Sequence, residues 1–584
     1  MNWYVTNILG TRNIGKQIQR ESFHCSSEII FNEFLINNTM VKFSVDGYIL
    51  PRTQFYDQYS NLKQPELIRN LYTKFGLDFI NYIKGVFNIL IIVGEDFYIF
   101  NDRHSIKKFF IYQDNNRFLI SNNLKIISDN IGLQLDTENA VLFCLMEHFI
   151  DGTTLFKNVT YSKPASKLFY SKSLQFDQYW YSDELLNLKL EEYSFDELAA
   201  KWRTIIRQYV DYLKPEAITM TLTGGNDSRM ILSALLNLGI KPNAFTFGNP
   251  NSFDCVVAAE LARYADLNYH NYYVKNPTSE WFEQYGNKVI KMGNSLINIH
   301  RAHRLDAIER EMENNPANEM IFGGFMGGSY IKGITYDDYI TAKIIRLWEH
   351  DKHEGNNIIK PLIFEKSIRI ETININNIIE KLEKQSFLTA NNKINREFHY
   401  VYQVIGSMHD VQDTDIFNSK IKYTVNPFMD DDFLDILFSS KYSMLNKNYS
   451  SKNPFKRANQ PRFHCEIMHR LASELSDIKF AKKGFYTVNE FLGNRYVYLF
   501  KRFYRYKINR KYYPPNFPYH AWLREFIEQK LFNNKSEVLE IFNIEKLNDA
   551  FMESTSHHNE GYWHLFTNPA NLMKNVQYYV NGDL

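Results

Sequence analysis

A glycine turn between an apolar stretch and a helical pattern carries the clearest chemistry of this sequence. The turn is Thr223-Gly-Gly-Asn-Asp-Ser228; a β-branched strand pattern over 217–222 precedes it, and a helix pattern over 228–238 follows, with Gly239 as its stop. Adjacent glycines leave backbone N–H groups uncovered, and the positive end of the helix lies behind them. We therefore expect this turn to bind phosphate or pyrophosphate.

The side chains of the turn extend this prediction. The hydroxyls of Thr223 and Ser228 can donate to phosphate oxygens, and Asp227 can hold a divalent cation against them. The turn is not a Walker loop, because the Gly-Lys-Ser/Thr sequence is missing. Two glycines after a strand are common in α/β folds, so alone they indicate only a tight turn.

The elements after the turn predict a parallel sheet that positions it. Strand patterns over 244–248 and 267–274 flank a helix pattern over 253–265. Strand and helix alternation at this spacing is typical of a parallel α/β sheet, whose ligands bind at the carboxyl ends of the strands. Leu222, Phe247 and Gly248 are predicted to lie at that edge, although a single aromatic residue there can equally be core.

The first third of the chain has a different pattern. Short strands are predicted over 86–93, 97–101, 109–112 and 117–121, with one helix over 65–75. The stretch 41–50 is predicted to be a hairpin that turns at Asp46-Gly47. Together these elements predict an antiparallel meander with a helix on it, consistent with layered sheets.

Ordered motifs resemble the asparagine synthetase family. Thr-Gly-Gly-x-Asp-Ser is similar to the PP-loop of the ATP pyrophosphatases, whose usual first residue is Ser. Asp46-Gly47-Tyr48, Gly85-Val86-Phe87, Asp102-Arg103 and residues 109–112 resemble, in order, the amidotransferase domain of that family. The segments 423–430 and 479–485 are similar to its later Pro-Phe-Leu-Asp and Lys-x-Gly-Phe motifs, and Asp430–Asp432 are expected at the start of a helix over 433–438.

The resemblance implies a fold, a reaction and site residues. Residues 1–185 would form a degenerate class II glutamine amidotransferase-like domain of layered antiparallel sheets, of the Ntn-hydrolase type. Residues 190–584 would form a PP-loop synthetase domain with a parallel α/β sheet and a helical C-terminal half. With ATP and Mg²⁺ the family adenylylates a carboxylate and releases pyrophosphate. The residues so implied are Leu222, Thr223, Gly224, Gly225, Asp227, Ser228, Phe247 and Gly248 for the nucleotide, Asp227 for the metal, and Lys482, with Lys483 in the neighbouring register, as the catalytic lysine.

Two departures from the family pattern bear on activity. The family's glutaminase uses a cysteine at position 2, where this chain has Asn2, and Cys25 is expected to be an ordinary free thiol. The family's acidic glycine-rich loop corresponds to 321–329, where Gly328 and Ser329 replace its carboxylates; Asp337 and Asp338 lie farther along. β-Lactam synthetases and lasso-peptide cyclases resemble the same plan with the same loss of the cysteine.

Composition excludes several classes of protein. Lys and Arg number 67 against 66 Asp and Glu, which gives no reason to expect a nucleic-acid partner. No apolar run is long enough to span a membrane and no signal peptide is recognisable, so we expect a cytoplasmic protein. The four cysteines are scattered, which indicates neither a disulfide framework nor a zinc site.

Basic and aromatic residues alternate over 495–511. One interpretation is a surface for an acidic peptide, a polyanion or a membrane. The other is a helix packed on the core, with lysine and arginine stems covering apolar surface. We expect the packed arrangement.

The sequence leaves several functions open. The main prediction is an AMP-forming amide ligase that works without glutamine hydrolysis, such as a macrolactam cyclase or another amine-to-carboxylate ligase. Its partners would be a small-molecule or peptide carboxylate and an amine, with a precursor peptide among the candidates. The alternatives are a glutamine- or ammonia-dependent asparagine synthase and a non-catalytic nucleotide-binding protein. A PP-loop tRNA-modifying enzyme is disfavoured by the balanced charge and the absence of cysteine pairs.

Overall fold

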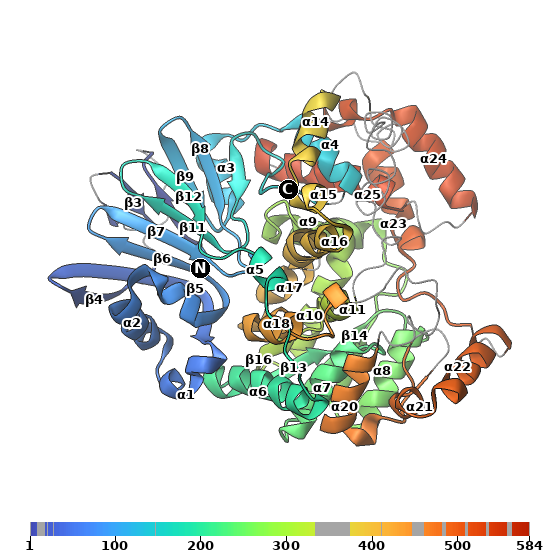
Figure 1. The fold of residues 1–584 in the computed structure, drawn as a ribbon. Coiled ribbons are helices and arrows are strands. Elements are labelled where there is room, and N and C mark those ends of the chain that lie inside the picture. The colour runs from blue at the N-terminus through green and yellow to red at the C-terminus, as the bar shows by residue number, and fades with distance from the viewer. Residues whose placement is uncertain are drawn as a thin grey trace.

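The architecture has an N-terminal part built on antiparallel sheets and a C-terminal part built on a parallel sheet and many helices (Figure 1). This is the fold class that the sequence predicts. The computed structural model describes residues 2–8, 18–19, 22–26, 28–146, 148–332, 369, 374–409, 411–446, 461–481, 486–508, 512–532, 537–557 and 563–582.

Two six-stranded antiparallel sheets make up the N-terminal part, in the orders β10-β8-β9-β1-β3-β2 and β12-β11-β7-β6-β5-β4. The predicted strands over 86–93, 97–101, 109–112 and 117–121 are confirmed as β6, β7, β8 and β9. The strands are β1 (Tyr4–Thr6), β2 (Ile18–Gln19), β3 (His24–Cys25), β4 (Asn32–Ile36), β5 (Thr39–Pro51), β6 (Ile83–Val93), β7 (Asp96–Asn101), β8 (Phe110–Asp114), β9 (Arg117–Ser121), β10 (Val159–Tyr161), β11 (Ser166–Tyr170) and β12 (Leu174–Gln178).

Alternating side chains stack these sheets face to face. Val5 and Ile111 of the first sheet share a buried core with Ile99 of the second. Their neighbours Tyr4 and Phe110 belong instead to the core that includes α3 (Leu124–Ile131) and α4 (Thr137–Met146). The outer face of the second sheet is covered by α2 (Gln64–Phe75), the helix expected over 65–75. The result confirms the predicted layered antiparallel sheets, and the structure adds helices on both outer faces.

The predicted hairpin at Asp46-Gly47 is wrong. β5 runs without interruption from Thr39 to Pro51 and pairs with β6 along its whole C-terminal length. Gly47 is needed for close approach, since with φ at +117° a Cβ would lie 2.1 Å from the carbonyl oxygen of Val86. The hairpin turns earlier, between β4 and β5, at Asn37 and Asn38, whose φ angles of 48° and 64° fit a two-residue turn.

The C-terminal part contains a five-stranded parallel sheet of order β15-β14-β13-β16-β17. The predicted strands over 217–222, 244–248 and 267–274 are confirmed as β13 (Ala217–Thr221), β14 (Asn243–Phe247) and β15 (Tyr269–Tyr272). The connecting helices are also as expected, α7 (Asp227–Asn237) and α8 (Phe253–Tyr264). β16 (Asn318–Phe322) and β17 (Tyr423–Val425) complete the sheet, so its carboxyl edge gathers residues that follow all five strands.

Helices surround this sheet. α6 begins with a capping box in which Glu197 N–H donates to Ser194 Oγ (3.2 Å) and Ser194 N–H to the Glu197 carboxylate (2.8 Å). No helix among the described residues is both long and apolar enough to cross a membrane. The other helices are α1 (Tyr56–Tyr59), α5 (Asp183–Leu186), α6 (Phe195–Leu213), α9 (Ser279–Met292), α10 (Ala302–Asn314), α11 (Gly327–Lys332), α14 (Ile375–Glu383), α15 (Ser386–Thr389), α16 (Lys393–His399), α17 (Val411–Asn418), α18 (Asp431–Phe438), α20 (Arg462–Leu471), α21 (Val488–Leu492), α22 (Arg495–Phe503), α23 (Tyr519–Ile527), α24 (Ile544–His557) and α25 (Trp563–Val576).

The predictions for the cysteines and for the basic aromatic stretch over 495–511 have different outcomes. All four cysteines are free and buried, as expected of thiols outside a disulfide framework. The helix α22 exists, but the expectation that its aromatic residues pack on the core is wrong for most of them. Tyr498 packs inward, whereas Tyr496 and Phe500 are 75% and 70% exposed.

Candidate nucleotide-binding site

The predicted phosphate turn lies between the end of β13 and the start of α7, at the carboxyl edge of the parallel sheet. Its two hydroxyls are brought together, since Thr223 Oγ1 and Ser228 Oγ are 3.0 Å apart. Thr223 N–H donates to Ser228 Oγ (3.1 Å), and Gly225 N–H donates to Thr223 Oγ1 (3.2 Å). These bonds hold the turn closed at the positive end of α7, a geometry suited to an anion.

Gly224 is required by crowding. A Cβ there would lie 2.3 Å from Ala481 Cβ and 3.0 Å from Val257 Cβ. Ala481 N–H donates to the Gly224 carbonyl oxygen at 2.9 Å. The segment that leads to the predicted Lys482 motif therefore packs directly on the phosphate turn.

Arg229 fixes this segment from the other side. Its guanidinium donates to the carbonyl oxygens of Ile478 (2.7 Å) and Lys479 (2.9 Å) and lies 4.1 Å from the ring centroid of Phe480. Burial lowers the pKa of Arg229 to about 10, so the group stays charged at neutral pH. Lys482 and Lys483 lie outside the described residues, and what the structure shows is that residue 481, just before them, contacts the turn.

Asp227 is paired with a histidine that the sequence did not point to. His464 Nε2, on α20, lies 2.7 Å from Asp227 Oδ1. The histidine side chain is fully buried, while 27% of the aspartate side chain is exposed. This contact joins positions 237 residues apart, so no local pattern could have indicated it.

The glycine-rich loop predicted over 321–329 lies against the same aspartate. A Cβ on Gly327 would come within 2.8 Å of Asp227 Oδ1, and one on Gly324 within 3.3 Å of Asp227 Cβ. Gly328 also faces this carboxylate, at 3.7 Å from Oδ2 for an added Cβ. The loop thus occupies the place expected of it, and its glycines allow the approach. Asp337 and Asp338 lie outside the described residues.

The donor set fits a nucleotide better than it fits an isolated cation. Asp227 is a carboxylate at the helix start, next to the hydroxyls and N–H groups that would bind phosphate. Mg²⁺ can bind through one carboxylate when phosphate oxygens and water supply its other ligands. Among the described residues, no group of three or more His, Cys, Asp or Glu side chains is placed to hold a metal by itself.

The nucleotide residues predicted at the ends of β13 and β14 lie in different surroundings. Leu222 is completely buried, and its N–H donates to the Phe245 carbonyl (2.9 Å) inside the sheet. Phe247 is half-buried and stacks on Phe517, with ring centroids 6.1 Å apart. Gly248 has φ of +131°, and a Cβ on it would be 3.2 Å from the Phe517 ring. A C-terminal segment therefore covers this end of β14.

A buried charge cluster lies beside Phe247. Arg301 and Arg304 both donate to Asp413 Oδ1, and the Arg304 guanidinium is 5.8 Å from the Phe247 ring centroid. Burial alone would raise the pKa of Asp413, but the two arginines hold it below its usual value. The cluster ties α10 to α17 at the carboxyl edge of the sheet, and sequence reasoning missed it.

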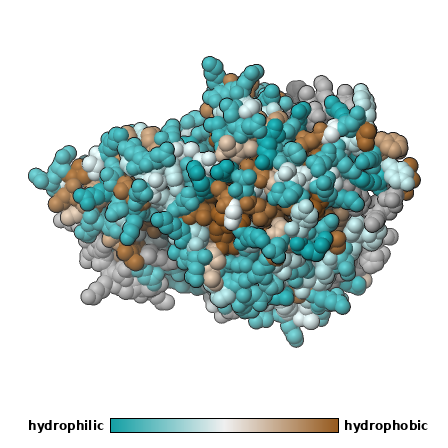
Figure 2. All heavy atoms as spheres, turned by 90° about the horizontal axis from the view of Figure 1, so that it is seen from below, coloured by the Kyte–Doolittle hydropathy of each residue, from teal (hydrophilic) through white to brown (hydrophobic). Residues whose placement is uncertain are grey.

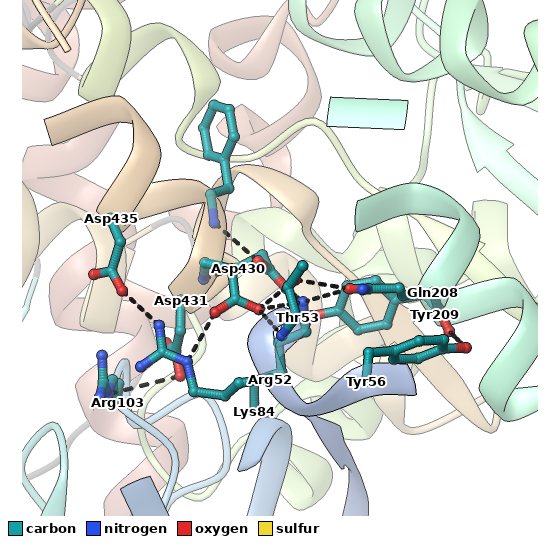
Figure 3. Close-up of polar contacts among 12 residues, drawn as sticks. Arg52, Thr53, Tyr56, Lys84, Arg103, Gln208, Tyr209, Asp430, Asp431 and Asp435 are labelled. Carbon is teal, nitrogen blue, oxygen red and sulfur yellow. Dashed lines mark hydrogen bonds and ion pairs between the residues drawn. The ribbon is translucent and has the colours of Figure 1, made fainter. Parts of the chain in front are cut away.

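The segment predicted over 423–430 connects the parallel sheet to the N-terminal part. Asp430 caps α18 by accepting from the N–H groups of Asp432 and Phe433 at 3.0 and 2.9 Å, as the helix-start prediction required. Lys84, on β6, reaches Asp430 (2.9 Å) and Asp432 (2.8 Å), and Arg52 Nε reaches Asp432 (2.8 Å). Figure 3 shows these side chains converging from both parts of the chain.

In this interdomain cluster the pKa values of the neighbouring residues Asp431 and Asp432 are shifted in opposite directions. Burial alone would raise the pKa of Asp432, but Lys84 and Arg52 hold it well below its usual range. For Asp431 burial prevails over the attraction of Arg103 and Arg52, and its pKa is raised to about 7. The cluster is a buried structural link, and it is distinct from the phosphate turn.

Two cavities among the described residues lie away from the turn. One of about 220 Å³ is lined by residues of the N-terminal part, including Trp180, and by Gln385 and Tyr402. A second of about 610 Å³ follows β8, β10 and β11. The anion-binding groups converge at the turn.

No protein-family model matches the chain, and no curated protein matches it. Two solved structures show a distant similarity. "Structure of the allosteric regulatory enzyme of purine biosynthesis" is 9% identical, with a TM-score of 0.22 over 48% of this chain and 76% of that chain. Glutamine phosphoribosylpyrophosphate amidotransferase from B. subtilis, complexed with ADP and GMP, is 10% identical, with a TM-score of 0.20 over 56% and 75%. Similarities this low assign no activity, which has to be argued from this chain's own residues.

Proposed function

We propose that this chain is an ATP-dependent, AMP-forming amide ligase that activates a carboxylate as an acyl-adenylate and joins it to an amine. The observation that carries the proposal is the closed glycine turn at the carboxyl edge of the parallel sheet, with two hydroxyls and a helix N-terminus converging on it. This arrangement suits a leaving pyrophosphate, whose added charge it would stabilise. The resemblance to the PP-loop motif supports the same reaction class.

The position of each residue in or beside the turn gives its proposed role. Thr223, Ser228 and the N–H groups around Gly224 would hold the β- and γ-phosphates, and Asp227 would hold Mg²⁺ against them. Bound Mg²⁺ would supply charge neutralisation of the phosphates. Lys482 would reach the same phosphates, a role supported by the contact of residue 481 with the turn.

The amine is proposed to come from the substrate or from ammonia, without glutamine hydrolysis. The N-terminal part contains two cysteines, Cys25 and Cys144, and both are buried, at 0% and 5% exposure. Cys25 lies on β3 and Cys144 on α4, and a buried thiol cannot attack a glutamine side chain unless the elements packed over it rearrange. A macrolactam cyclase or another amine-to-carboxylate ligase is therefore preferred over a glutamine-dependent asparagine synthase.

The second candidate is a nucleotide-binding protein without ligase activity. It is favoured by the 2.7 Å contact between His464 Nε2 and Asp227 Oδ1, because this contact occupies one of the two carboxylate oxygens that a metal would use. In this case ATP would bind at the turn but would not be cleaved.

Calorimetry with ATP and Mg²⁺, followed by pyrophosphate release across a panel of carboxylates and amines, tests the proposal. We expect binding, and release that depends on an acyl substrate. Asp227→Asn is expected to lower release at least about tenfold. Asp266→Asn, an exposed aspartate paired only with Lys241 at 2.8 Å among the described contacts, is the matched control. Binding without release, unaffected by Asp227→Asn, would favour the second candidate.

A further inference from the structure

The helix α22 and its continuation to Ile508 expose an unusual set of side chains. Tyr496, Phe500 and Phe503 are 75%, 70% and 58% exposed, and Ile508 is 66% exposed. We propose that this basic aromatic helix docks the protein on the surface of an anionic lipid membrane. The inference is independent of the nucleotide site.

The exposed apolar residues form one continuous face. Tyr496, Phe500, Phe503 and Tyr504 are spaced at i, i+4, i+7 and i+8, so they lie along one side of the helix. Soluble helices of this kind normally turn such a face to the core. Here only Tyr498 among the described residues of α22 is fully buried.

The opposite side of the helix is firmly held, so the outward face is a fixed feature. The Tyr498 ring packs edge-to-face on Tyr486 and Phe491, at centroid distances of 5.4 and 5.2 Å. Arg505 makes a bidentate contact with Glu490, at 2.6 and 2.8 Å, and Lys501 reaches the same carboxylate at 3.3 Å. These contacts anchor α22 to α21 and leave the aromatic face toward solvent.

Charge favours an anionic partner. Lysine or arginine recurs through 495–511, with no aspartate or glutamate in that stretch, although the whole chain is nearly neutral. Arg495 and Lys507 are exposed beside the apolar residues, whereas Lys501 is 47% exposed and also contacts Glu490. Cationic side chains next to Phe, Tyr and Ile are typical of helices that lie in a membrane interface, where the rings enter the acyl boundary and the charges bind phosphate.

The shape of this region favours a lipid surface over a peptide ligand. α22 lies at the periphery of the molecule, beyond α21 and α8 (Figure 1). Figure 2 shows scattered hydrophobic residues at that end of the molecule, and its larger hydrophobic area lies near the centre of the face. A projecting helix can lie on a flat bilayer, whereas a peptide ligand binds best in a groove.

Sedimentation of the full-length protein with vesicles tests the proposal. We expect binding to vesicles of phosphatidylcholine mixed with phosphatidylglycerol, weak binding to pure phosphatidylcholine, and loss of binding in high salt. The double variant Phe500→Ser, Phe503→Ser should lower the partition coefficient at least about tenfold. Arg495→Gln with Lys507→Gln should lower it by about fivefold for each charge removed.

A matched control separates this surface from general stickiness. Phe176→Ser removes a phenylalanine that is 54% exposed on β12, and it should leave vesicle binding unchanged. Thermal unfolding of every variant is measured beside the native chain, and the changes should be small, since surface substitutions usually shift stability by about 0.5 kcal/mol or less. No binding to anionic vesicles, or equal binding by the Phe500 and Phe503 variant, would overturn the proposal. Binding to polyglutamate but not to vesicles would overturn it in favour of an acidic protein partner.

Discussion

The adjacent aspartates Asp431 and Asp432 should affect stability with opposite signs. Burial raises the pKa of Asp431 to about 7, from an ordinary value of 3.8, so the folded chain keeps a proton that the unfolded chain releases. Stability therefore falls as pH rises through that window, from about 4 to about 7. Lys84 and Arg52 overcome the effect of burial and lower the pKa of Asp432, so its contribution is present at neutral pH and is lost in acid.

The size of the Asp431 effect follows from the shift. Ionising this carboxyl at pH 8 costs the folded state on the order of 4 kcal/mol, since the shift is about 3 units and each unit is worth about 1.4 kcal/mol. At pH 5 the corresponding cost is smaller, roughly 1 to 2 kcal/mol, because only the unfolded chain is then ionised. Asp431→Asn should thus become more stabilising, relative to the native chain, by roughly 2 to 3 kcal/mol between pH 5 and pH 8.

Urea unfolding of the full chain at several pH values measures this difference. Asp432→Asn serves as the paired variant, and it should destabilise at pH 7 by about 3 to 5 kcal/mol, because it leaves Lys84 and Arg52 without a full counter-charge. The charge states assigned to Asp431 and Asp432 would be refuted if Asp431→Asn and Asp432→Asn changed the free energy of unfolding in the same direction. It would also be refuted if the Asp431→Asn difference did not change with pH.

Three further results are expected. Gly224→Ala should weaken ATP binding at least about tenfold and destabilise the fold by about 1 to 3 kcal/mol, because the added Cβ would lie 2.3 Å from Ala481 Cβ. Calorimetry measures the binding and thermal melting the stability, and Gly225→Ala, as the control, should change stability less. Arg229→Met should destabilise by about 3 kcal/mol and expose residues 478–481 to protease, and unchanged proteolysis would contradict the anchoring role. The four buried cysteines should react with a thiol reagent only after denaturation, whereas rapid labelling of the native chain would contradict the buried positions.

Local signals in the sequence predicted the elements that carry the phosphate turn. The elements β13, α7 and β14 could be predicted because the apolar residues of each recur at regular spacing and a glycine or polar residues follow it. The hairpin at Asp46-Gly47 was wrong because an Asp-Gly pair favours a turn only when the flanking strands pair with each other. Here β5 pairs with β4 and β6 instead, and a sequence pattern does not show which strands are neighbours.

The contacts that complete the site could not be predicted, because they join distant segments. His464 meets Asp227 only because α20 packs on α7, and neither helix carries a local signal for that pairing. The same holds for Lys84, which lies in a mostly apolar strand and is buried between Asp430 and Asp432. A buried lysine in this strand is stabilised only once α18, which carries its aspartate partners, packs against it.

The interdomain cluster gives the N-terminal part a role that does not depend on glutamine hydrolysis. α18 begins at Asp430, which follows β17 by a few residues, and Asn426 next to β17 approaches Gly323 of the glycine-rich loop. Because Lys84 and Arg52 hold Asp430 and Asp432, the antiparallel sheets fix the position of the same edge that carries the phosphate turn. If the proposed function holds, these sheets would position the phosphate turn whether or not the N-terminal part hydrolyses glutamine.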